Sequence, residues 1–232
     1  MAFERSKPRG SRYQQKIDAV TLHVAYEGAQ DEAEYFTQLS QSIPKQFHSL
    51  LRLIPVKKSS TASAPSKVFD DLCTHLETHK VNLKTGQHIA FMVIDRDHHF
   101  SGNHQKETRP TVRACKQRNI QVLCSTPAFD LWILCHYIDV AGQDEAFKQK
   151  ALANKKISTG NTFLKGEVSK VKAGETTKAM LKRTEVALTN EEKFRGNDTE
   201  EAMPPAQLQS NVGKIINVMI DHGVPIVKAL SR

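Results

Sequence analysis

The sequence predicts an α/β fold: a parallel four-stranded sheet flanked by helices, followed by a mostly helical C-terminal extension. Strand-like apolar segments alternate with amphipathic segments over about the first 140 residues, and this alternation is typical of a parallel sheet with right-handed crossovers. Residues 88–94 are almost continuously apolar, as expected for a strand buried on both faces. Beyond Ala141, lysines are frequent and strand formers are few, which favours helices.

The N-terminal elements follow from local composition. Residues 1–17 are basic and polar, and we expect a flexible arm there. A first strand is predicted at about 18–25, where apolar and β-branched residues gather. A helix is predicted at about 31–48 because its apolar residues recur on one face, and Asp31 is expected to cap it.

The middle of the chain repeats this pattern. A second strand is predicted at 50–56, and the Lys- and Ser-rich stretch 57–65 reads as a loop. The next helix has apolar residues at i, i+3, i+4 and i+7. These are Phe69, Leu72, Cys73 and Leu76.

After the central strand, three further elements complete the predicted sheet domain. They are a helix near 107–118, a strand at 120–124 and an apolar helix at about 129–138. The spacing of Leu208, Val212, Ile215, Ile216 and Met219 predicts another helix near the C-terminus. The expected organisation is therefore an arm (1–17), a catalytic α/β domain (18–140) and a helical basic extension (141–232).

Composition restricts the class of protein. The chain has 232 residues, 39% of them hydrophobic and 25% charged, which is typical of a globular protein. No apolar run approaches the roughly 20 residues of a membrane-spanning helix, so we expect a cytoplasmic protein without a membrane partner. The four cysteines show no C-x-x-C spacing and are expected to be reduced. A net charge of +8 favours polyanionic partners, nucleic acid first among them.

Acidic residues follow three of the predicted strands. Glu27 follows the first, Asp95 and Asp97 follow the central strand, and Asp130 comes shortly after the last. The carboxyl ends of the strands in an open α/β sheet share one crevice, so these side chains are expected to converge. Carboxylate oxygens suit Mg²⁺ or Mn²⁺. The alternative is that they are solvated turns and helix caps.

Three segments resemble the RloB family, a Toprim-like group of bacterial proteins associated with restriction and abortive-infection loci. Residues 26–36 are similar to its E-G-x-x-T-E-x-x-Y-F motif, 93–97 to its hydrophobic-D-x-D motif, and 125–137 to its S-N-P-x-F-E-x-W motif region. Asp31 stands where the family has Thr, Thr126 where it has Asn, and Asp130 where it has Glu. The last change shortens the reach of the carboxylate by one methylene.

The resemblance implies a Toprim-like, Rossmannoid sheet and metal-dependent phosphodiester cleavage, with Mg²⁺ or Mn²⁺ as cofactor. In that reading Asp95 and Asp97 are the main metal ligands, Glu27 is a ligand or general base, and Glu32 and Asp130 hold a second metal or position water. The expected function is nuclease activity on DNA or RNA, tRNA included, as an effector of bacterial anti-phage defence. Gly213-Lys214 lacks a surrounding P-loop, so any ATPase is a separately encoded partner.

Basic and polar residues near the acidic segments are candidates for contacts with nucleic acid. Phosphate contacts of this kind supply affinity without sequence readout. The candidates are Arg96, Ser125, Lys165, Lys170, Lys172 and Lys178. A structural salt bridge for Arg96 and an ordinary solvated face for the lysines are the alternatives.

Histidine and tryptophan residues near the motifs are expected to be structural. His98, His99 and His104 match no zinc template and are expected at the surface. Trp132 and His136 lie in an apolar helical segment and are expected in the core rather than against a base.

Two other functions remain open. The protein is alternatively a non-catalytic module that binds nucleic acid or an ATPase through a degenerate Toprim site, or a nucleotidyl transferase. The choice between DNA and RNA, the number of metals, the oligomeric state and the activation trigger are not determined by the sequence.

Overall fold

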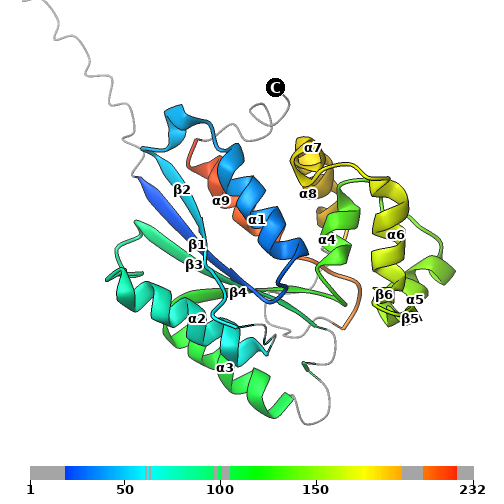
Figure 1. Cartoon of the computed structure of the whole chain (residues 1–232), viewed down its shortest axis with the longest axis horizontal. Helices are drawn as coiled ribbons and strands as arrows, with labels where there is room; N and C mark the ends of the chain where they lie inside the picture. Colours follow the sequence, from blue (N-terminus) through cyan, green and yellow to red (C-terminus); the bar gives the residue numbers. More distant parts are fainter. Residues whose placement is uncertain are drawn as a thin grey trace, which may run out of the picture.

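The centre of the protein is a four-stranded parallel sheet with the order β2-β1-β3-β4 (Figure 1). The computed structural model describes residues 19–60, 62, 64–96, 99–100, 105–194 and 206–223. The strands are β1 (Val20–Tyr26), β2 (Leu51–Pro55), β3 (His88–Asp95) and β4 (Ile120–Ser125). The α/β prediction is confirmed, and each predicted strand is present within two residues of its expected ends. The arm predicted for 1–17 lies outside the described residues.

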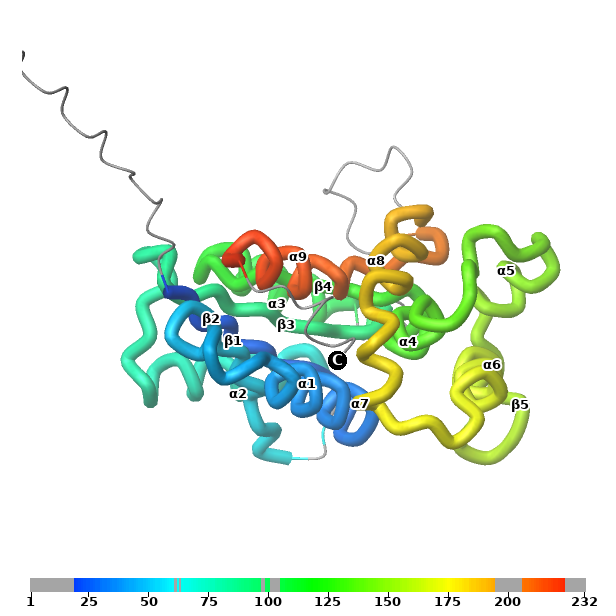
Figure 2. The backbone as a smooth tube through the Cα atoms, turned by 90° about the horizontal axis from the view of Figure 1, so that it is seen from above, coloured from blue at the N-terminus to red at the C-terminus, as the bar shows by residue number. Residues whose placement is uncertain are grey.

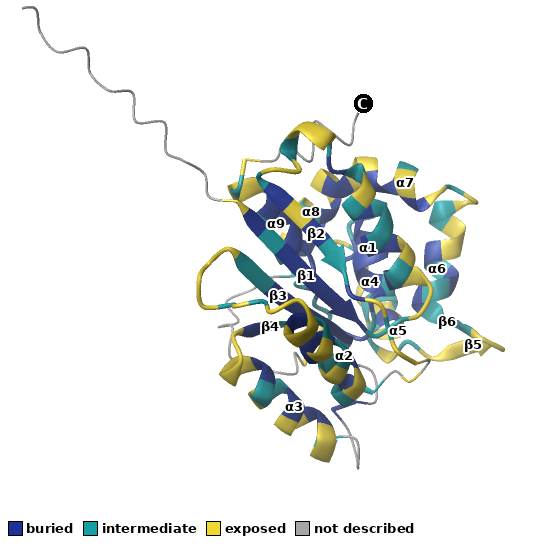
Figure 3. Ribbon diagram, turned by 60° about the vertical axis from the view of Figure 1, so that its left-hand side comes forward, coloured by how far each residue is buried: buried dark blue, intermediate teal, exposed yellow. Residues whose placement is uncertain are grey.

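The two faces of the sheet are covered by different helices. Side chains alternate along a strand, so Leu22 and Val24 of β1 enter the core cluster that contains α1 (Asp31–Ser42). Ala25 enters the cluster on the opposite face, formed with α2 (Pro65–Thr78) and α3 (Gln105–Gln117). Figure 1 shows the sheet between these two layers, Figure 2 shows the same elements from above, and Figure 3 shows the strands as largely buried. This double cover explains the apolar run of β3.

The first helix differs from its prediction at both ends. It stops at Ser42, because Pro44 follows and its backbone is extended, and a short 3₁₀ turn, η1 (Lys45–Phe47), replaces the expected last turn. Gln30 occupies the N-cap position, so Asp31 is the first helical residue and the prediction that it caps the helix is wrong. An acidic residue there still complements the helix dipole.

The C-terminal part is mostly helical, as predicted, but it also contains a hairpin that the sequence did not predict. Strands β5 (Lys156–Ser158) and β6 (Asn161–Thr162) are too short and too exposed for periodicity to reveal them, and Gly160 makes the turn with φ +73°. The helices are α4 (Asp130–Cys135), α5 (Glu145–Ala153), α6 (Phe163–Lys172), α7 (Thr177–Met180), α8 (Thr184–Glu192) and α9 (Gly213–Asp221), with a 3₁₀ turn, η2 (Leu181–Arg183), between α7 and α8.

The last described segment lies against the sheet. The Asn211 side-chain oxygen accepts a hydrogen bond from the Cys124 backbone N–H at 2.8 Å, and Gln209 bridges to Thr126. Ile215 and Ile216 of α9 are buried in the same core cluster as residues of α1, and Figure 1 shows α9 on the same side of the sheet as α1. Residues 206–223 therefore cover part of the sheet face on which α1 also packs. The predicted boundary near residue 140 stays a prediction.

Candidate active site

The strand order creates a crevice at the ends of β1 and β3. The connection from β1 leads to β2 on one side, whereas β3 connects to β4 on the other. Ligands of open α/β sheets bind at such a switch point, outside the carboxyl ends of the strands. Glu27 directly follows β1, and Asp95 is the last residue of β3. Two of the predicted site residues are thus placed at the switch point.

Glu27 is held by groups from the other side of the switch point. Its Oε2 accepts a hydrogen bond from the Asp95 backbone N–H at 3.2 Å, and its Oε1 lies 2.7 Å from Nε2 of His99. The side chains of Glu27 and His99 are 12% and 4% exposed. The Lys58 ammonium donates to the backbone carbonyl of Glu27. The carboxylate is therefore oriented before any ligand binds.

Glu32 folds back from α1 toward the end of β1. Its Oε1 accepts a hydrogen bond from the backbone N–H of Gly28 at 3.0 Å, and the residue is 8% exposed. A Cβ at position 28 would lie 1.7 Å from Glu32 Oε2. Glycine is therefore required at position 28 if the Glu32 carboxylate is to stay in place.

Asp95 is bonded to the start of α4, next to Asp130 in the chain. Asp95 Oδ1 accepts a hydrogen bond from the Phe129 backbone N–H at 2.8 Å, and Phe129 occupies the N-cap position just before Asp130. Asp130 is half-buried. The bond to Phe129 therefore joins the end of β3 to the motif that contains Asp130.

The carboxylates influence one another strongly. Burial raises the pKa of Glu32 to about 7, and the negative charges of Glu27 and Asp130 add to the rise. Burial raises the pKa of Asp95 well above its ordinary value, with Glu32, Glu27 and Asp130 contributing. Burial and then Asp31 raise the pKa of Asp130 to about 6. The pKa values of Glu32 and Asp95 thus respond to the charges of Glu27 and Asp130, which concentrates negative charge near the end of the sheet. The assignment of these residues as metal ligands stays a prediction.

This concentration fits a hard divalent cation by donor type and by charge. Oxygen ligands are those that Mg²⁺ and Mn²⁺ prefer, and a cation would offset the repulsion that raises the pKa values. Among the described residues, however, no three His, Cys, Asp or Glu side chains lie close enough to form a metal-holding group. Asp97, the second acid of the D-x-D motif, lies outside the described residues, as do His98 and His104.

Two of the predicted lysines line a cavity beside the acidic residues. Lys165 Nζ of α6 lies 3.2 Å from Asp31 Oδ2, and a cavity of about 160 Å³ between α1, α4 and α6 is lined by Lys165, Lys172 and Asp130. Lys170 instead pairs with Glu167 of its own helix at 2.6 Å. Lys178 is exposed and does not line this cavity. Helix α6 therefore contributes to the site. Lys165 and Lys172 line the cavity, whereas Lys170 and Lys178 do not.

Ser125 lies beside Asp95 in the sheet. The two residues are register partners, and Ser125 Oγ is buried without a hydrogen-bond partner in the part of the chain that is described. The Ser125 carbonyl accepts from the Arg96 backbone N–H at 2.8 Å. The backbone of Arg96 is thereby fixed at the site, and its predicted contact with phosphate stays a prediction.

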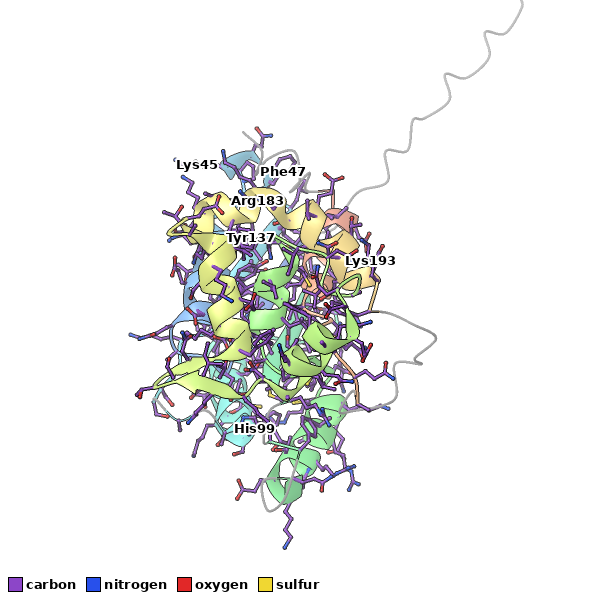
Figure 4. The ribbon with its side chains drawn as sticks, turned by 90° about the vertical axis from the view of Figure 1, so that its right-hand side faces the viewer. Lys45, Phe47, His99, Tyr137, Arg183 and Lys193 are labelled. Atoms are coloured by element: carbon purple, nitrogen blue, oxygen red, sulfur yellow. The ribbon has the colours of Figure 1, made fainter. Side chains whose placement is uncertain are left out.

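The prediction of surface histidines is wrong for His99, which is 3% exposed and bound to Glu27. Nothing in the sequence distinguished it from its neighbours, because its burial depends on the position of β1. In Figure 4 His99 lies well apart from Tyr137 and Arg183, whose cation–π contact of 5.1 Å belongs to a different surface. Trp132 and His136 are fully buried, as predicted.

Three residues that contribute to the site were not predicted from the sequence to do so. They are His99, Lys58 and Asp31, which lies near Lys165 and Asp130. Asp31 is four residues after Glu27 at the start of a helix, and that spacing was the available signal. Lys58 gave none, because a lysine in a Ser-rich loop is ordinarily solvated.

The cysteines are in the state that the sequence predicts. The four cysteines are unpaired and buried. No helix among the described residues is long and apolar enough to cross a membrane.

Comparison with known proteins gives one match. A family model described as RloB-like protein matches residues 22–219, which is most of the chain. A search of curated proteins and a search of solved structures each found no match.

Proposed function

The chain belongs to the RloB-like protein family, and on this premise we propose that it is a metal-dependent nuclease with a Toprim-like site. The reaction is hydrolysis of phosphodiester bonds in DNA or RNA, tRNA included. The observation that carries the proposal is that Glu27 and Asp95 lie at the switch point of a parallel sheet, with Glu32 and Asp130 near enough for their charges to act on Asp95.

The residues that would hold Mg²⁺ or Mn²⁺ are Glu27, Asp95 and Asp97, with Glu32 and Asp130 available for a second ion or for water. When bound, the cation supplies the positive charge that the scissile phosphate and an attacking water require. The fit rests on the oxygen donors and on the nearby negative charges that add to the raised pKa values of Glu32 and Asp95.

The chain's own side chains have separate tasks in this proposal. Glu27, fixed by His99 and the Asp95 N–H, is placed to accept a proton from water, and its position is set before substrate arrives. Lys165, close to Asp31 and lining the same cavity as Asp130, offers a positive charge to a substrate phosphate. The net charge of +8 favours a polyanionic substrate.

The biological role is proposed from the family. Restriction and abortive-infection loci associated with RloB proteins suggest an effector of anti-phage defence that works with a separately encoded ATPase in the cytoplasm. Activity that depends on such a partner would leave the isolated protein inactive.

A non-catalytic binding module is the second candidate. It is favoured by the hydrogen bonds that Glu27, Glu32 and Asp95 each accept from backbone N–H groups, because such bonds also have a purely structural use.

The test is a cleavage assay with plasmid DNA, single-stranded DNA and total tRNA in Mg²⁺, Mn²⁺ or EDTA. Asp95→Asn preserves an acceptor for the Phe129 N–H but removes the charge. Asp70→Asn is the matched control, because Asp70 is exposed on α2 and far along the chain from the motifs. We expect metal-dependent cleavage that is lost in the Asp95 variant and kept in the control.

Cleavage that persists in EDTA or in Asp95→Asn would refute the assignment. Absence of cleavage together with absence of calorimetric Mn²⁺ binding would favour the non-catalytic module. Mn²⁺ binding that Asp95→Asn abolishes, without cleavage, would support the site and direct the search to the partner.

A further inference from the structure

A second feature of the molecule is a groove between α1 and the loop that follows β2. Its volume is about 660 Å³, within the range of small-molecule sites. One wall is α1, and the other is formed by residues 57–60. In the chain, α1 precedes β2 and residues 57–60 follow it (Figure 1).

The wall on α1 is a single row of side chains. The groove is lined by Ala29, which lies just before the helix, and by Ala33, Thr37 and Gln41 of α1. The three helical residues are spaced four apart, as expected for one face of a helix. Ala29 and Ala33 are small, so the end of the groove nearest the carboxylates is open and apolar. The last two are polar, so hydrogen-bonding groups lie farther along.

The opposite wall is anchored to the rest of the protein. The backbone N–H of Ser59 donates to Asp71 Oδ2 at 3.1 Å, and its hydroxyl donates to Asp71 Oδ1 at 2.5 Å. Lys58 is fixed through the Glu27 carbonyl. This part of the loop is therefore held in place at both residues, and the groove is formed before a ligand enters.

The groove also differs in charge from the cavity beside α6. Its lining includes Lys57 and Lys58 and contains no carboxylate, whereas Asp31, Glu34 and Asp130 line the other cavity. A polyanion is thus attracted to the groove and meets mixed charges on the other side of α1.

The groove leads to the candidate active site. Tyr26, the last residue of β1, lines it, and Glu27 follows directly. The contact between Lys58 and the Glu27 carbonyl joins the loop wall to the carboxylate cluster. If one phosphate of a nucleic-acid strand lies at the carboxylates, the neighbouring nucleotide lies in the groove.

We propose that this groove binds a nucleotide of single-stranded nucleic acid next to the scissile phosphate. The base packs over Ala29, Ala33 and Pro55, and Lys57 contacts the backbone phosphate. The inference rests on the proposed nuclease function for its position in the reaction, but the binding itself requires neither metal nor cleavage.

The test measures binding in EDTA, so that cleavage does not enter. The probes are fluorescently labelled eight-nucleotide oligothymidylate and oligouridylate, followed by anisotropy with the full chain at several salt concentrations. Ala33→Leu fills the groove without changing charge, and Lys57→Gln removes one charge. Their controls are Ala146→Leu, exposed on α5, and Lys84→Gln, exposed at the other end of the sheet before β3.

We expect both groove variants to weaken binding about tenfold and the controls to change it less than about twofold. Lys57→Gln should also lower the slope of log K against log salt by about 0.7, the value for one phosphate contact on a single strand, whereas Ala33→Leu should leave the slope unchanged. A difference between the two probes would identify the sugar that the groove prefers.

Binding by Ala33→Leu and Lys57→Gln equal to that of the wild type, or no binding of either probe by the wild type, would overturn the proposal. Groove-dependent binding with neither cleavage nor calorimetric Mn²⁺ binding would uphold the groove and count against only the nuclease function. Cleavage that is unaffected by both groove variants would uphold the nuclease and refute the groove.

Discussion

Replacing Glu32 with Gln should stabilise the metal-free protein at pH 8 and leave its stability nearly unchanged at pH 4. The structure gives the reason. Glu32 is 8% exposed, and burial together with the charges of Glu27 and Asp130 raises its pKa from 4.5 to about 7. Gln keeps an Oε1 that accepts the bond from the Gly28 N–H but carries no charge.

The sign of the effect follows from proton linkage. Between pH 4.5 and 7 the folded protein keeps a proton on Glu32 that the unfolded chain has lost, so the wild type loses stability as the pH rises through this range. One pKa unit corresponds to about 1.4 kcal/mol, and the full effect above pH 7 is therefore about 3 kcal/mol. Below pH 4.5 both states are protonated and the effect disappears.

The assay is urea denaturation in EDTA at pH 4, 6 and 8. The matched control is Glu34→Gln, because Glu34 is exposed on the same helix. We expect the free energy of unfolding of Glu32→Gln to exceed that of the wild type by an amount that grows with pH. The corresponding difference for Glu34→Gln should stay small. Mn²⁺ should reduce the difference in unfolding free energy between Glu32→Gln and the wild type at pH 8, because the wild type binds the ion more tightly.

A Glu32→Gln variant that is no more stable than the wild type at pH 8 in EDTA would refute this reasoning. It would show that the Glu32 carboxylate is not held against the charges of its neighbours.

Three other predictions test separate parts of the fold. Gly28→Ala should expel the Glu32 carboxylate, because the added Cβ would lie 1.7 Å from its Oε2; a cleavage assay should then show at least about tenfold less activity, with little change in thermal stability. The pKa of His23 is lowered to about 4 by burial and by the neighbouring His75, His88 and His79. The His23 ring lies 3.0 Å from His75 and 3.1 Å from His88. Between pH 7 and pH 4 the unfolded chain binds a proton at His23 that the folded protein does not bind. The stability of the wild type relative to His23→Asn should therefore fall by up to about 3 kcal/mol over this range in urea titrations. Glu191→Ala should destabilise the protein by about 2 kcal/mol in the same assay, because it removes the buried acceptor of the Ser210 hydroxyl and the Gly213 N–H and leaves both donors unsatisfied.

The sequence by itself determined the sheet and the chemical character of its end. Strand β3 was identified because a strand covered on both faces is apolar at every position. Glu27, Asp95 and Asp130 were identified because parallel strands end at one edge, so acids that follow them share a crevice. These inferences need only local periodicity and the direction of the strands.

The tertiary structure decided which other side chains reach that edge. His99 was expected at the surface but is buried against Glu27, and Lys165 reaches the cluster while Lys170, five residues later, does not. Both outcomes depend on how a loop and a distant helix pack against the sheet. The hairpin of β5 and β6 and the groove beside α1 were missed for a related reason, since short exposed strands have no periodic signal, and a groove is formed by the separation of two elements rather than by either one. Local patterns record the environment of each segment, whereas the contacts between segments depend on the path of the whole chain.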